Sequence, residues 1–175
     1  MPKARIEEDK LSPVVEKFLA RKYSHTKREV LLSLPEWKGA GRSIRLDVVA
    51  SDGKELVLVE TKAACYPQII GDAIGQLLVY EQIIFQNKER FVKVLSDKGI
   101  TVQAIGKLKL YSAFPNHKHP ENWMEWVAPA TEVFRAVAGE RQIGLLLIQF
   151  KKDASAREWE EIGKDNLDDL EVVEV

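Results

Sequence analysis

Arg45–Lys62, which reads RLDVVASDGKELVLVETK, is the stretch that decides the fold. Two runs rich in β-branched and apolar residues flank the polar turn Ser51–Lys54, and an Asp-Gly turn between such runs is typical of a β-hairpin. Successive side chains of a strand point to opposite faces of its sheet. One face of the second strand should therefore carry Leu56, Leu58, Glu60 and Lys62, and the other face should carry Val57, Val59 and Thr61.

Three charged residues, Asp47, Glu60 and Lys62, interrupt or end these apolar runs. A charge beside a core is unfavourable unless it is paired or bound to a metal ion. Two carboxylates and an ammonium group at the end of a hairpin suggest a site for a hard divalent cation, Mg²⁺ or Mn²⁺, which prefers oxygen ligands. Asp47 and Glu60 would supply carboxylates, and the backbone carbonyl of Thr61 a third oxygen.

Lys62 lies on the same face as Glu60 and would therefore be near the attacking water of a hydrolytic reaction. It could orient that water, help to deprotonate it or stabilise a pentacovalent phosphate. The sequence leaves these three roles open.

The composition is that of an ordinary globular protein and indicates one domain. The chain has 175 residues, of which 45% are apolar and 30% charged, enough for one hydrophobic core. Cys65 is the only cysteine, which rules out an internal disulfide and fits a reducing compartment. No apolar run reaches the length of a membrane span, and the charged first ten residues do not resemble a signal peptide. We expect a cytoplasmic protein without membrane contact.

The net charge of −1 conceals an acidic C-terminal end. Residues 151–175 hold 4 Lys/Arg and 9 Asp/Glu, a balance of −5, while the rest of the chain holds 22 basic and 18 acidic residues, a balance of +4. A mildly basic body tolerates a polyanionic partner without proving one. We expect one domain over residues 1–152 and a solvated acidic tail over residues 153–175. A tail that covers a basic surface is the alternative.

Hydrophobic periodicity and turn residues predict alternating helices and strands. In chain order the expected elements are a helix over 5–23, strands over 25–34, 42–50 and 54–62, a helix that opens at Pro67, a helix over 87–97, a strand over 107–114, a helix over 122–138 and a strand over 144–150. Ser12-Pro13 allows the first helix to begin at Pro13 instead. Beyond Lys152 we expect a short helix and a loose tail. Sequential strands with helices before and after them indicate an α/β fold around one mixed sheet.

Two helices can bring further polar side chains to the hairpin. On the helix that opens at Pro67, Gln76 and Tyr80 lie four residues apart and therefore on one side. Gln76 stands among apolar residues, which favours a role in the site, whereas a tyrosine on an amphipathic helix is more often part of the core. Glu8 and Glu16 on the first helix are candidate carboxylates, although a solvent-facing glutamate is the commoner outcome for each.

These features resemble a known family. Asp47, followed after a short hairpin by Glu60-Thr61-Lys62, resembles the Asp…Glu-x-Lys signature of the PD-(D/E)xK nuclease superfamily, which has the restriction-endonuclease-like fold. The expected element order over residues 5–114 is similar to the αβββαβ core of that superfamily. Gln76-Leu-Leu-Val-Tyr80 resembles the Gln-x-x-x-Tyr motif of its RecB-type members. Residues 115–175 lie outside the resemblance.

The resemblance implies roles for the hairpin residues. Asp47 and Glu60 would be metal ligands, and Lys62 would be the catalytic lysine. Leu46 stands where the signature has proline, a departure that is common in the superfamily. The cofactor implied is Mg²⁺ or Mn²⁺.

The resemblance extends to the two helices. Gln76 would belong to the catalytic group, and many members carry a further acidic residue on the first helix. Glu8 or Glu16 could match that acid as a metal ligand, and Glu8 is favoured because it shares a helical stripe with Ser12, Val15 and Leu19.

Basic and aromatic residues near the hairpin are candidates for nucleic-acid contact. Lys38, Arg42 and Arg45 could contact DNA phosphates near the cleft, or they could be ordinary surface charge. Tyr80 is a fourth candidate for contact with the nucleic acid.

Three functions compete. The first is a Mg²⁺-dependent nuclease that hydrolyses phosphodiester bonds, with DNA as the expected substrate and RNA as the second choice. The second is a catalytically inactive nucleic-acid-binding or protein-interaction module on the same fold. The third is a protein in which Glu60 and Lys62 form only a structural ion pair. The joint presence of both carboxylates and the lysine favours the first, and cleavage of both strands by so small a chain would suit a homodimer.

Overall fold

The computed structural model describes residues 8–34, 43–116, 127–139, 141–152 and 167–175. In this part of the chain one mixed sheet has the strand order β1-β2-β3-β4-β5-β6. The strands are β1 (His25–Leu32), β2 (Ile44–Ser51), β3 (Gly53–Thr61), β4 (Val102–Pro115), β5 (Ile143–Phe150) and β6 (Leu170–Glu174). β3, β4 and β5 run parallel to one another, and the other neighbouring pairs are antiparallel.

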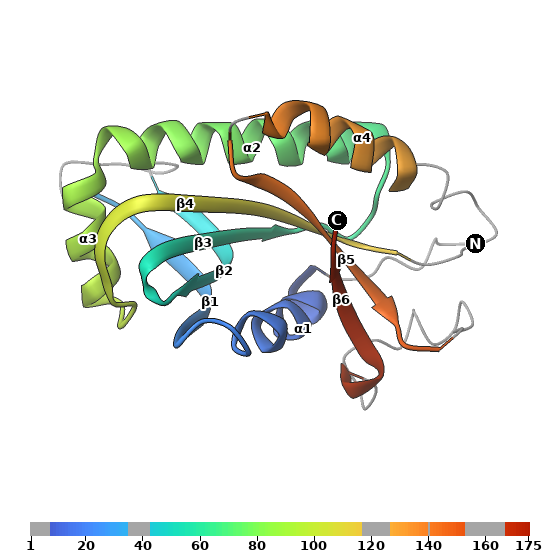
Figure 1. The fold of residues 1–175 in the computed structure, drawn as a ribbon, viewed down its shortest axis with the longest axis horizontal. Coiled ribbons are helices and arrows are strands. Elements are labelled where there is room, and N and C mark those ends of the chain that lie inside the picture. The colour runs from blue at the N-terminus through green and yellow to red at the C-terminus, as the bar shows by residue number, and fades with distance from the viewer. Residues whose placement is uncertain (1–7, 35–42, 117–126, 140, 153–166) are drawn as a thin grey trace.

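Helices cover both faces of the sheet (Figure 1). They are α1 (Glu8–Leu19), α2 (Pro67–Gln86), α3 (Lys88–Asp97) and α4 (Val127–Ala138), and a short 3₁₀ turn, Leu167–Asp169, precedes β6. α2 and α4 lie above the sheet in the view of Figure 1, and α1 lies below it. α2 and α3 form the crossover that two parallel strands, β3 and β4, require. The expected α/β class with a mixed sheet is confirmed.

The sheet separates two hydrophobic cores. Leu56 and Leu58 of β3 pack in the larger core beneath α2, α3 and α4, whereas Val57 and Val59 pack in the smaller core against α1. This confirms the alternation expected for the second strand of the hairpin, β3, and it places Glu60 and Lys62 on the α2 side.

α2 is fixed firmly on the larger core. Pro67 occupies its first turn, where a proline needs no hydrogen-bond partner for its nitrogen. Ala73, Leu77 and Ile84 are fully buried, and burial of one Leu or Ile side chain stabilises a fold by about 1.5–3 kcal/mol. The polar residues on the neighbouring turns of α2 therefore have a fixed position over the sheet.

The expected starts of two elements are corrected. α1 begins at Glu8 and runs through Pro13, so the helix does not start at Pro13. Pro13 is the sixth of the twelve residues of α1 and thus lies inside the helix, where a proline removes one backbone hydrogen bond. β4 begins at Val102, five residues earlier than expected, because Val102 and Ile105 add to the larger core.

The C-terminal end is also ordered differently from the expectation. Leu170–Glu174 forms β6 and pairs antiparallel with β5, whereas a loose acidic tail was expected. Leu170 is 5% exposed and packs in the smaller core with Val172 alongside, so this short apolar pattern outweighs the acidic composition around it. Of the helix expected over 122–138, residues 127–138 form α4, and residues 122–126 lie outside the described part.

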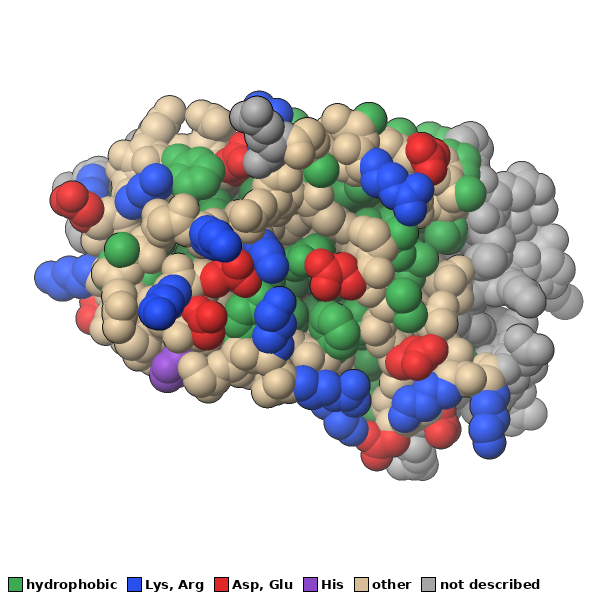
Figure 2. Space-filling model, viewed as in Figure 1, with side chains coloured by type: hydrophobic (Ala, Val, Ile, Leu, Met, Phe, Trp, Pro, Cys, Tyr) green, Lys and Arg blue, Asp and Glu red, His purple; other side chains and the backbone are tan. Residues whose placement is uncertain are grey.

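The surface carries charges of both signs. Figure 2 shows Lys and Arg side chains interspersed with Asp and Glu side chains over the strands, and the described basic residues form no continuous patch on this face. Among the described residues, none of the helices combines the length and the hydrophobicity needed to cross a membrane.

Candidate active site at the ends of β2 and β3

The site lies where β2 and β3 separate. The pairing between these strands reaches Val48 and Val59 and goes no further. At the next position, Asp47 Oδ2 accepts a hydrogen bond of 2.7 Å from the backbone N–H of Thr61. The carboxylate thus serves as the partner of a strand amide, a group that must be satisfied when it is buried. This contact brings Asp47 to the end of β3, where Glu60 stands.

Asp47 occupies a break in the side-chain alternation of β2. Leu46 packs in the larger core but Val48, two residues on, packs in the smaller one. The register pairs Arg28 with Val48 and Val30 with Leu46, which places Glu29 of β1 across from Asp47. Glu29 is the only described non-glycine residue with a positive φ, 53°. The two strands therefore change face together at this position.

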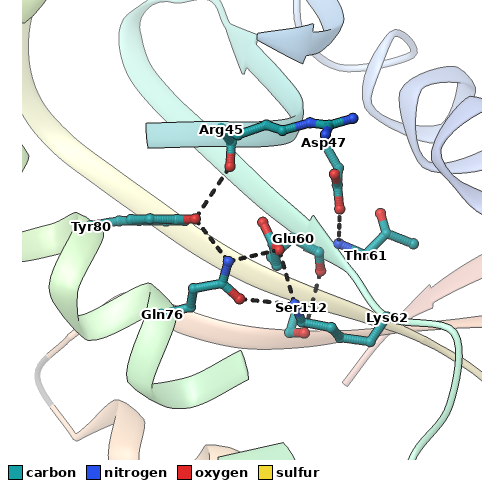
Figure 3. Close-up of polar contacts among 8 residues, drawn as sticks. All are labelled: Arg45, Asp47, Glu60, Thr61, Lys62, Gln76, Tyr80 and Ser112. Atoms are coloured by element: carbon teal, nitrogen blue, oxygen red, sulfur yellow. Dashed lines mark hydrogen bonds and ion pairs between the residues drawn. The ribbon is translucent and has the colours of Figure 1, made fainter. Parts of the chain in front are cut away.

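Glu60 is the centre of a compact hydrogen-bonded group. Its Oε1 accepts hydrogen bonds from Lys62 Nζ at 2.9 Å and from Gln76 Nε2 at 3.0 Å. Lys62 Nζ also donates to Gln76 Oε1 at 2.8 Å, which closes a triangle between β3 and α2 (Figure 3). Glu60 and Lys62 are 7% and 9% exposed. Burial of an ion pair is tolerable only with such added hydrogen bonds.

Tyr80 ties this group to β2. Its hydroxyl accepts a hydrogen bond of 2.9 Å from Gln76 Nε2 and donates one of 3.2 Å to the backbone carbonyl of Arg45. Burial, followed by the nearby charge of Glu60, raises the pKa of the phenol, so the hydroxyl stays protonated. Tyr80 is 8% exposed. This geometry favours a positioning role over the direct nucleic-acid contact expected from the sequence.

The two oxygens of Glu60 differ in their surroundings. Oε1 accepts the two hydrogen bonds described above, whereas Oε2 is buried and has no hydrogen-bond partner among the described residues. Burial, and then the charge of Asp47, raise the pKa of the Glu60 carboxyl, while Lys62 and its hydrogen bond act in the opposite direction. A buried acceptor without a partner costs about 1–3 kcal/mol. A hard cation beside Oε2 would satisfy it.

The chemistry of the site fits a divalent cation through two carboxylates. Asp47 and Glu60 are oxygen donors close enough for their charges to interact, and hard cations prefer such donors. Thr61, whose backbone carbonyl is the third expected ligand, follows Glu60 in the chain and is fully buried. Within the described part of the chain, no group of three or more His, Cys, Asp or Glu side chains could hold a metal ion. The described site therefore rests on one aspartate and one glutamate.

Neither of the two candidate carboxylates of α1 is placed beside Glu60 by the described structure. Glu8 is the first residue of the helix, and its side chain lies outside the described part. Glu16 forms an ion pair of 2.8 Å with Arg28 of β1, so the structure does not bring it to Glu60. Its partner is on the exposed side of an edge strand.

The candidate nucleic-acid contacts are mostly not described. Lys38 and Arg42 lie outside the described residues. Arg45 is exposed on β2, two residues before Asp47. Of the basic candidates, Arg45 alone can be placed beside the site.

Sequence reasoning missed one member of the site. Ser112 of β4 is fully buried and pairs in register with Glu60. Its hydroxyl donates a hydrogen bond of 3.3 Å to the backbone carbonyl of Glu60, which anchors this end of β3 to β4. A serine within the apolar end of a buried strand was the available signal.

Comparison of the chain with protein-family models, with curated proteins and with solved structures gave no match.

Proposed function

We propose that this chain is a Mg²⁺- or Mn²⁺-dependent nuclease of the PD-(D/E)xK type that hydrolyses phosphodiester bonds in DNA. The observation that carries the proposal is the buried Glu60 carboxylate, which keeps one oxygen without a partner while Asp47 and Lys62 stand beside it. The order α1-β1-β2-β3-α2-β4 supports a restriction-endonuclease-like core. α3 is then an addition between α2 and β4.

In this proposal Asp47 and Glu60 hold the cation. A divalent cation at such a site activates water and neutralises charge on the phosphoryl group. The hydrogen bond from Thr61 N–H keeps Asp47 in place. Burial of Glu60 favours the cation further, because a counter-charge relieves the cost of an ionised carboxylate with little solvent around it.

Lys62 is the residue that would face the reacting phosphate. In hydrolysis a P–O bond forms to the oxygen of water, and the P–O bond to the leaving sugar oxygen breaks. The ammonium of Lys62 can orient the water or stabilise the added negative charge of the transition state. Gln76 holds Lys62 and Glu60 in one arrangement through its amide oxygen and nitrogen. Tyr80 in turn holds Gln76.

A cleavage assay with matched variants tests the proposal. Linear, circular and single-stranded DNA are incubated with Mg²⁺ or Mn²⁺ and with the wild type, Asp47→Asn, Glu60→Gln or Lys62→Ala. Each variant should lose at least about a hundredfold of the activity, the usual minimum for loss of a catalytic acid, base or charge-stabilising group. Glu89→Gln and Lys93→Ala, which remove exposed charges on α3, should cleave like the wild type.

Three outcomes contradict the nuclease proposal. Equal cleavage by the wild type and the site variants would assign the activity to a contaminant. No cleavage under any condition, together with retention of DNA, would favour a binding module on the same fold. Absence of both cleavage and metal binding would leave Glu60 and Lys62 as a structural ion pair.

A further inference from the structure

A polar pocket lies away from the candidate active site. It has a volume of about 510 Å³, within the usual size range of small-molecule sites. α2, the first half of β4 and the segment before β5 surround it. Its polar and aromatic lining residues are Glu81, Gln82, Phe85, Lys107, Arg141 and Gln142. Lys107 precedes Ser112 by five residues on β4, about 17 Å along a strand, so this pocket and the Glu60 site are separate.

A buried carboxylate holds an exposed arginine at this pocket. Glu81 is 7% exposed, and its Oε2 accepts a hydrogen bond of 3.2 Å from Arg141 Nε. The side chain of Arg141 is 53% exposed. Among the described residues it is Nε that makes the side-chain contact, so the two terminal amino groups of Arg141 are left to meet a ligand.

Stability explains this arrangement poorly. An ion pair with one exposed partner contributes little to stability, and burial of the Glu81 carboxylate opposes folding. Fixing an arginine through Nε has a different effect, because it orients the planar guanidinium and presents its outer edge in one direction. That edge matches the oxygens of a phosphate group with two parallel hydrogen bonds.

The other lining residues suit the same ligand. Lys107 supplies a second cation, so the charge of the lining is positive even when Glu81 is counted. Gln82 and Gln142 offer amide groups. Phe85 is 37% exposed. Lys88 Nζ lies over its ring, 4.5 Å from the centroid, and the rest of the exposed ring offers apolar surface against which a sugar or base can pack.

We propose that this pocket binds the phosphate group of a nucleotide or of a nucleic-acid strand. Arg141 is the main contact, Lys107 adds a second charge, and Glu81 is a positioning residue that orients Arg141. The proposal does not depend on cleavage at Glu60, since a catalytically inactive chain would keep the pocket.

Titration of the full chain with inorganic phosphate tests the proposal by calorimetry and by the NMR signal of Arg141 Nε–H. Phosphate should shift that signal in a saturable way. Arg141→Gln should weaken binding at least about tenfold, and Arg141→Lys, which keeps the charge but loses the planar edge, should weaken it several-fold. Arg135→Gln is the matched control, because Arg135 pairs with exposed Glu132 on α4, and it should bind phosphate like the wild type.

Glu81→Gln separates an oriented site from simple positive charge. Loss of a negative charge should strengthen non-specific attraction of an anion, whereas loss of the positioning carboxylate should weaken a built site. We expect weaker binding. Tighter binding by Glu81→Gln, normal binding by Arg141→Gln, or equal loss in Arg135→Gln would each overturn the proposal.

Competition identifies the source of the phosphate. A nucleoside 5′-monophosphate and a short single-stranded oligonucleotide without terminal phosphates are each tested for displacement of inorganic phosphate. Displacement by the monophosphate alone would identify a free nucleotide as the ligand. Displacement by the oligonucleotide would identify a nucleic-acid strand. If neither displaces it, the assignment to a nucleotide or strand is wrong.

Discussion

At the scale of single residues, Glu60 combines three roles that usually belong to different side chains. It is a member of a buried ion pair, an acceptor for the α2 amide and the candidate ligand of a cation. Its charge is opposed by burial and by Asp47, which raise its pKa, and supported by Lys62 and Gln76. Its ionisation state would therefore link folding to the proposed cation binding.

The raised pKa of Glu60 predicts a pH-dependent difference in stability. The folded state binds the proton of Glu60 more tightly than the unfolded state, so the stability from this group is full below its ordinary pKa and is lost as pH rises through the raised pKa. Glu60→Gln cannot ionise. As pH rises through this window, the free energy of unfolding should shift in favour of the variant, by about 1.4 kcal/mol for each tenfold difference in proton affinity.

Urea unfolding of both proteins from about pH 4 to about pH 8, without divalent cations, measures this difference. If plots of the free energy of unfolding against pH stay parallel for the two proteins over the whole range, Glu60 titrates alike in the folded and unfolded chains.

Divalent cations should stabilise the wild type. A ligand that binds only the folded state at about 100 times its Kd raises the free energy of unfolding by about 2.7 kcal/mol, which in a chain of this size raises the Tm by roughly 5–10 °C. A thermal melt with Mn²⁺ checks this. Asp47→Asn and Glu60→Gln should lose the increase, and Glu89→Gln should keep it. An equal increase in all four proteins would place the cation elsewhere.

At the scale of elements, the paired change of face in β1 and β2 sets the direction of Asp47. Such a change requires an unusual backbone conformation at one position, and Glu29 supplies it with a φ of 53°. A left-handed conformation costs a non-glycine residue about 1–2 kcal/mol. Glu29 of β1 thus carries strain directly opposite Asp47, a candidate metal ligand on the neighbouring strand β2. Strained backbone positions are often found at functional sites.

Glycine at this position should relieve the strain. Glu29→Gly should raise the free energy of unfolding by about 1 kcal/mol, because glycine adopts a positive φ without steric cost. Thr26→Gly, at a position of the same strand with an ordinary φ, should lower it by about 1 kcal/mol. Chemical denaturation measures both. Destabilisation of similar size in the two variants would mean that Glu29 carries no strain.

β6 should contribute to stability as a full member of the sheet. Leu170→Ala removes a side chain that is 5% exposed in the smaller core and should cost about 2–3 kcal/mol. Val173→Ala, at a position 39% exposed, should cost less than about 0.5 kcal/mol. Urea denaturation of the two variants is the measurement. A neutral Leu170→Ala would instead fit a tail that does not pack.

The sequence was sufficient where the signal was local. Alternation along β3 placed Glu60 and Lys62 on one face, and the four-residue spacing on α2 placed Gln76 above Tyr80. It was insufficient where the outcome depended on contacts between distant segments. No residue type near Glu29 indicates a positive φ. Glu81 and Arg141, which pair, are 60 positions apart in the chain. At Leu170, we gave the surrounding acidic residues more weight than the apolar pattern.

At the scale of the whole molecule, a net charge of −1 gives DNA no general attraction. Any binding must come from local groups of basic side chains. Such binding weakens as the salt concentration rises, because the release of counterions from the DNA then becomes less favourable. Arg45 is the described basic residue closest in sequence to Asp47, and it is exposed.

Arg45→Gln should therefore reduce the salt dependence of DNA binding. If Arg45 contacts one phosphate, the slope of log K against log salt should fall by about 1. Fluorescence anisotropy over a series of salt concentrations measures the slope. Arg135→Gln on α4 is the control and should leave the slope unchanged. Equal slopes in Arg45→Gln and the wild type would remove Arg45 from the interface.

In the hydrogen-bonded group around Gln76, each hydrogen bond has a defined donor and acceptor. The two amide hydrogens of Gln76 go to Tyr80 and Glu60 Oε1, and its oxygen accepts from Lys62. A hydrogen atom on Oε1 would point at other hydrogens, so an incoming proton has only Oε2 to occupy. In the proposed nuclease, acid and magnesium would then compete for one and the same atom, and a drop in pH would remove the cation by substitution.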